Sequence, residues 1–109
     1  MDRDNVWTTY NDENLEELQR INESYKSCLD EGKTERECVK IAVRMARERG
    51  YQSLEEAMAS GRKLQAGDKV YAVCMGKSIA MFQIGEQPLE NGLNILGAHI
   101  DSPRIDVKQ

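Results

Sequence analysis

LNILGAHID, residues 93–101, is the stretch that decides which fold this sequence predicts. Its apolar run through Leu96 and Ala98 is typical of a strand buried on both faces of a sheet. A strand of this kind needs neighbouring strands at its edges and layers above and below it. The segments that precede it in the chain therefore decide the fold class.

Three helices are expected before this stretch. Residues 34–37 (TERE) and 53–56 (SLEE) both match the capping-box pattern, which places helix starts at those points. Gly50 and Gly61 are expected to end these two helices. An earlier helix is predicted over residues 12–31, because apolar residues recur there at helical spacing. That stripe consists of Leu15, Leu18, Ile21, Tyr25, Cys28 and Leu29.

A β-hairpin is expected between the third helix and the apolar run. Residues 69–75 and 78–84 are rich in β-branched, aromatic and other apolar side chains. Gly76 and Lys77 between them suit a two-residue turn with glycine at the first central position. Helices, a hairpin and then a buried strand together predict a mixed α/β fold.

Composition excludes several classes of protein. The chain has 109 residues, enough for one domain at most, and a net charge of −4, which argues against a nucleic-acid domain. No apolar run approaches the length of a membrane span, and residues 1–5 do not begin a signal peptide. We therefore expect no nucleic-acid or membrane partner and a cytoplasmic location.

The cysteines suit an intracellular protein and do not predict a zinc site. The chain has an odd number of cysteines, three, and they are widely spaced, which makes a poor disulfide framework: Cys28, Cys38 and Cys74. Structural zinc sites bring their ligands in closely spaced pairs, and no two of these cysteines lie within four residues. Cys28 and Cys38 also fall at apolar positions of helical patterns, where cysteine acts as a small hydrophobe.

The acidic side chains are concentrated near the amino terminus. Residues 1–37 hold eleven acidic and five basic side chains, a net charge of −6, mainly on the first expected helix. Two interpretations remain open, a solvated helix face or a surface that docks a basic partner.

The candidate metal-binding and catalytic residues lie at the carboxyl end of the expected strand, where ligands bind in α/β sheets. His99, the only histidine, and Asp101 are two residues apart and therefore project from the same side of a strand. A carboxylate beside an imidazole fixes its tautomer and raises its basicity, which supports metal binding. A polar surface pair is the other interpretation of this spacing. Ser102 is a weaker candidate nucleophile, because the chain has no Gly-x-Ser-x-Gly elbow.

A family resemblance adds to this interpretation. Residues 97–108, GAHIDSPRIDVK, are similar to the first metal-site motif of the dinuclear zinc aminopeptidases of the aspartyl aminopeptidase and vacuolar aminopeptidase I type. The motif there consists of His, a variable residue, Asp-Ser-Pro and, a few residues on, a Lys, here Lys108. The order of the upstream elements also resembles this family.

The resemblance implies a zinc-dependent aminopeptidase with a three-layer α/β/α catalytic domain. His99 would bind one of two zinc ions, and Asp101 would orient His99 without binding metal itself. The implied reaction is removal of single amino-terminal residues from peptides by metal-activated water, with a Glu elsewhere as general base. The implied assembly is a homo-oligomer, a dodecamer in the family.

The chain departs from the family in the ligands that it holds. It has no second histidine, whereas a catalytic zinc needs at least three protein ligands. Residues 1–109 are therefore interpreted as the amino-terminal portion of the catalytic domain, inactive alone. The rest of that domain and an inserted dimerisation domain would lie downstream.

Three questions stay open at this point. The alternative function is a small acidic helical interaction module without catalysis. The metal could be zinc, manganese or cobalt, because one histidine does not discriminate among them. The preferred amino-terminal residue of the substrate is not predicted, and Arg104 is interpreted as a salt-bridge partner rather than a substrate contact.

Overall fold

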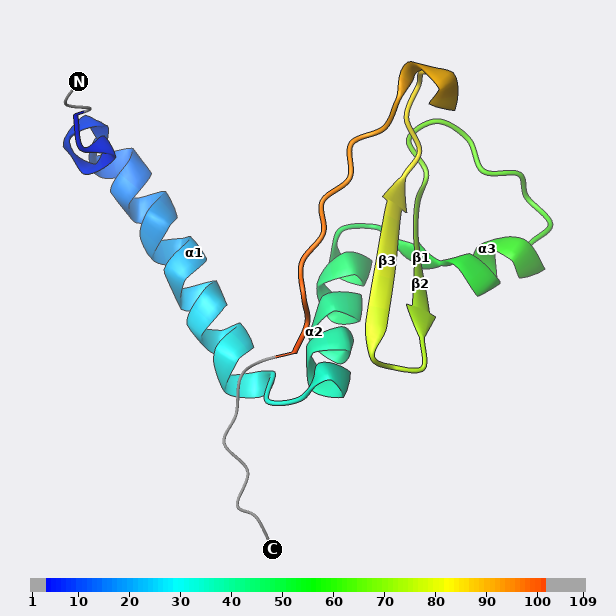
Figure 1. Cartoon of the computed structure of the whole chain (residues 1–109), viewed down its shortest axis with the longest axis horizontal. Helices are drawn as coiled ribbons and strands as arrows, with labels where there is room; N and C mark the ends of the chain where they lie inside the picture. Colours follow the sequence, from blue (N-terminus) through cyan, green and yellow to red (C-terminus); the bar gives the residue numbers. More distant parts are fainter. Residues whose placement is uncertain (1–3, 102–109) are drawn as a thin grey trace, which may run out of the picture. The chain divides into compact units, whose positions relative to one another are not determined.

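The computed structural model describes residues 4–101 of the chain, which divides into two compact units at residues 31 and 32. The first unit holds the 3-10 helix Val6–Thr9 and helix α1, Asp12–Glu31 (Figure 1). Asn11 caps α1, since its side-chain oxygen accepts a hydrogen bond from the Asn14 amide at 2.9 Å. The predicted bounds of this helix are confirmed. No side chain of α1 is buried, and within its apolar stripe only Leu18 and Cys28 are half-buried.

The second unit begins with the two helices that the capping boxes predicted, α2 (Glu35–Glu48) and α3 (Leu54–Ala59). Both boxes are formed as expected. Thr34 accepts from the amide of Glu37, while the Glu37 carboxylate accepts from the Thr34 amide at 2.9 Å. Ser53 and Glu56 repeat this reciprocal pair at the start of α3. Each box satisfies amide groups that the first helical turn leaves without an intrahelical acceptor.

The sheet has three strands in the order β1-β2-β3 within the described residues. β2 (Lys69–Cys74) and β3 (Ser78–Gln83) form the predicted antiparallel hairpin. β1 (Gln52–Ser53) pairs in parallel with β2 and was not predicted. Two residues are too few to show the alternation by which a strand is recognised in sequence. Helix α3 forms the crossover between these two parallel strands.

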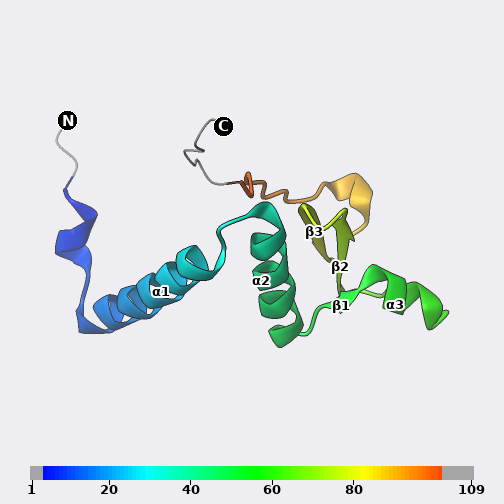
Figure 2. The same cartoon turned by 90° about the horizontal axis from the view of Figure 1, so that it is seen from below.

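The core lies where α2 and α3 cover opposite sides of the sheet (Figures 1 and 2). Val70 and Tyr71 of β2 are consecutive and therefore face opposite sides, yet their exposed fractions are only 2% and 5%. Both faces of β2 are thus covered at Val70 and Tyr71, whereas Val73 and Cys74 near the hairpin loop are exposed. The remaining buried apolar residues come from the two helices: Val39, Ile41, Ala46 and Ala57.

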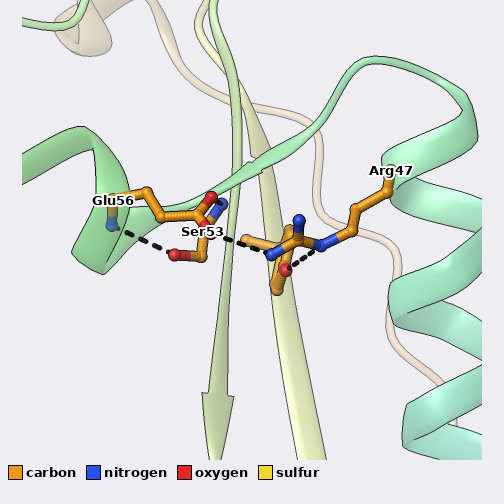
Figure 3. A network of polar contacts seen from close by, with 4 residues as sticks. Arg47, Ser53 and Glu56 are labelled. Carbon is orange, nitrogen blue, oxygen red and sulfur yellow. Dashed lines mark hydrogen bonds and ion pairs between the residues drawn. The ribbon is translucent and has the colours of Figure 1, made fainter.

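A polar network ties the two helices to the sheet (Figure 3). Arg47 of α2 donates from Nε to the Tyr71 hydroxyl at 2.9 Å and from Nη2 to the Glu56 carboxylate of α3 at 3.0 Å. The hydrogen bond with Tyr71, followed by that with Glu56, raises the pKa of Arg47. The hydrogen bond from Arg47 lowers the pKa of Glu56, and that from the Ser53 amide lowers it further. Arg47 and Tyr71 are 24 positions apart, so no local pattern indicates their contact.

The hairpin loop is longer than the predicted one. The register pairs Cys74 with Ser78, so the loop holds three residues, Met75–Lys77, and the predicted two-residue turn at Gly76 and Lys77 is wrong. Met75 and Gly76 have φ angles of 53° and 69°, and the Lys77 amide donates to the Cys74 carbonyl at 3.0 Å. Three-residue loops are among the commoner hairpin connections after two-residue ones. Arg36 of α2 also contacts this turn, donating to the Met75 carbonyl at 2.8 Å.

Met75 is unusual in this turn because a side chain disfavours the left-handed conformation. We expect Met75→Asn to raise the free energy of unfolding by about 0.5–1 kcal/mol, since asparagine tolerates a positive φ better than methionine does. Urea unfolding measures the effect. Met58→Asn is the matched control, because Met58 is 72% exposed but helical. This control should lower the free energy of unfolding by about 0.5 kcal/mol, since asparagine has the lower helix propensity. A loss of stability in Met75→Asn would contradict the strain argument.

The prediction of a buried strand over residues 93–101 is wrong. This stretch follows the 3-10 helix Leu89–Asn91 and carries no strand, and Leu93, Ile95 and Leu96 are 65%, 80% and 100% exposed. The physical reason is that no described segment pairs with its backbone or covers its faces, and a strand is held by a ladder of hydrogen bonds to its neighbours.

Among the described residues, no helix is both long and apolar enough to cross a membrane.

Candidate metal-binding site

The candidate site lies at the end of the extended stretch, where His99 and Asp101 contact each other. His99 Nδ1 lies 2.8 Å from the backbone oxygen of Asp101 and 3.2 Å from its carboxylate Oδ1. The two side chains are 78% and 68% exposed. Two-residue spacing in extended backbone brings the side chains to one side, as the sequence indicates. The contact therefore forms here without a strand ladder.

This arrangement leaves Nε2 of the His99 imidazole available to bind a metal ion. In the tautomer with a proton on Nδ1, that proton is donated to the two oxygens of Asp101, and Nε2 keeps its lone pair. A carboxylate that accepts from the far nitrogen of an imidazole fixes the ring's orientation and strengthens the other nitrogen as a ligand. His99 thus has the form of a single metal ligand with its orienting group.

The described part of the chain supplies no further ligands around His99. Within residues 4–101, no group of three or more His, Cys, Asp and Glu side chains is close enough to hold a metal ion. Cys28, Cys38 and Cys74 are free thiols, and only Cys74 is exposed. A catalytic zinc needs three protein ligands. The donors present are enough for one ligand position of such a site, and His99 is the residue that would supply that ligand.

The rest of the predicted motif cannot be placed in the same way. Ser102, Arg104 and Lys108 lie outside the described residues, as does Pro103. The other polar cluster that the structure reveals, around Arg47, is held by hydrogen bonds between secondary-structure elements. It joins α2, α3 and β2 at the surface of the second unit, where the Arg47 and Glu56 side chains are 54% and 53% exposed.

Comparison with known proteins gives a consistent result. Residues 28–109 match the family model described as Peptidase_M18, aminopeptidase I zinc metalloprotease (M18). A probable M18 family aminopeptidase 1 from Clostridium acetobutylicum is 47% identical over 105 residues, which cover 96% of this chain and 23% of the relative. The corresponding protein from Thermotoga maritima is 38% identical over 108 residues, 99% of this chain and 22% of the relative. The chain thus spans less than a quarter of the length of these relatives.

Solved structures agree with the sequence comparison. The crystal structure of aminopeptidase I from Borrelia burgdorferi B31 superposes with a TM-score of 0.82 at 37% identity, covering 93% of this chain and 24% of that one. An M18 family aminopeptidase from Thermotoga maritima gives 0.78 at 37% identity, covering 95% and 21%. The sequence match, the fold and the similarity of residues 97–108 to a metal-site motif lead to one conclusion. The chain belongs to the M18 family of aminopeptidase I zinc metalloproteases.

Proposed function

We propose that this chain supplies His99 as the first metal ligand of a zinc aminopeptidase that removes single residues from the amino terminus of peptides. The observation that carries the proposal is the contact between His99 Nδ1 and Asp101, 3.2 Å from its carboxylate, within a motif similar to the family's metal-site motif. Membership in a zinc metalloprotease family supports both the metal and the reaction class.

Each of the two residues has a defined part in this proposal. His99 presents Nε2 to one zinc ion, while Asp101 holds the ring by accepting the Nδ1 proton. Asp101 uses both its backbone oxygen and its carboxylate for this purpose, at 2.8 and 3.2 Å, and does not itself bind metal. The chemistry that zinc supplies in such enzymes is activation of a water molecule near neutral pH.

The proposal includes the setting of the site. Residues 1–109 form the amino-terminal portion of the catalytic domain, and the further metal ligands and the general base come from other sequence. Peptides are the substrates, and the protein acts as a cytoplasmic homo-oligomer. The alternative, an acidic interaction module without catalysis, is disfavoured by the family assignment, although α1 does offer an exposed acidic surface.

The 109-residue chain alone should neither hydrolyse peptides nor bind zinc tightly. It offers one histidine, whereas catalytic zinc needs three protein ligands. Isothermal titration calorimetry with zinc chloride is the measurement, and His99→Ala is the control for weak binding at the imidazole. Stoichiometric binding below micromolar concentration in the wild-type chain would show that it holds a complete site, contrary to the proposal.

A further inference from the structure

We draw no further inference here: the strongest candidate, the open pocket between the carboxyl end of α2 and the loop that joins α3 to β2, is lined by the cations Arg49, Arg62 and Lys69, but each of these side chains already has a hydrogen-bond or ion-pair partner within the chain, and nothing in the structure shows what covers the pocket.

Discussion

We expect replacement of His99 with alanine to remove the metal-dependent activity of an enzyme that contains this chain. The test protein is a chimera of the Clostridium acetobutylicum relative, in which this chain replaces the matched stretch of 105 residues. The two sequences are 47% identical there, so the chimera should fold and hydrolyse peptides. We expect His99→Ala to lower the turnover of aminoacyl chromogenic substrates by more than about a hundredfold, because one protein ligand of a metal is lost.

Metal content is the second measurement on the same chimera. The starting chimera should bind two metal ions per chain, and the His99→Ala variant should retain fewer, measured by mass spectrometry after dialysis. Asn94→Ala is the control, because Asn94 is exposed in the same stretch and has no part in the proposal. Full activity with two bound ions in His99→Ala would refute the assignment of His99 as a ligand.

Asp101→Ala should weaken metal binding rather than remove a binding position. Loss of a carboxylate that orients a metal-binding histidine typically costs about 10- to 100-fold in metal affinity or activity. We expect the lower part of that range, because the backbone oxygen of Asp101, 2.8 Å from His99 Nδ1, remains in the variant. The measurement is activity of the Asp101→Ala chimera against free zinc concentration.

The zinc titration distinguishes an orienting residue from a ligand. Excess zinc should restore most of the activity of Asp101→Ala but little of that of His99→Ala. Asp101→Asn keeps an oxygen acceptor without the charge, so its zinc requirement should lie between those of wild type and Asp101→Ala. An Asp101→Ala chimera that excess zinc cannot restore would assign Asp101 a direct part in the reaction or in metal binding.

The helices of this chain could be predicted closely from sequence. The bounds of α1 follow from its apolar spacing, and the capping boxes place the starts of α2 and α3. Each capping box is a set of hydrogen bonds between residues three positions apart, so the residues that decide it are close together in the sequence. The hairpin was predicted for a similar reason, from two short apolar runs around a glycine.

The errors concern features that depend on other parts of the chain. The hairpin loop holds three residues because the pairing of the two strands sets Cys74 opposite Ser78, and Met75 takes a positive φ there although it has a side chain. β1 is a strand only because it lies beside β2 at Val70 and Tyr71. The apolar stretch 93–101 has the composition of a buried strand, but no described segment pairs with it.

The sequence by itself determined the three helices, the hairpin and the pairing of His99 with Asp101. These depend on spacings of two to four residues, or on two neighbouring runs, whose geometry the backbone imposes locally. Only the tertiary structure decided that β2 is covered on both faces at Val70 and Tyr71, that Arg47 reaches Tyr71 across 24 positions, and that residues 93–99 are exposed. Burial and long-range hydrogen bonds depend on which segments meet in space, and a local sequence pattern does not contain that information.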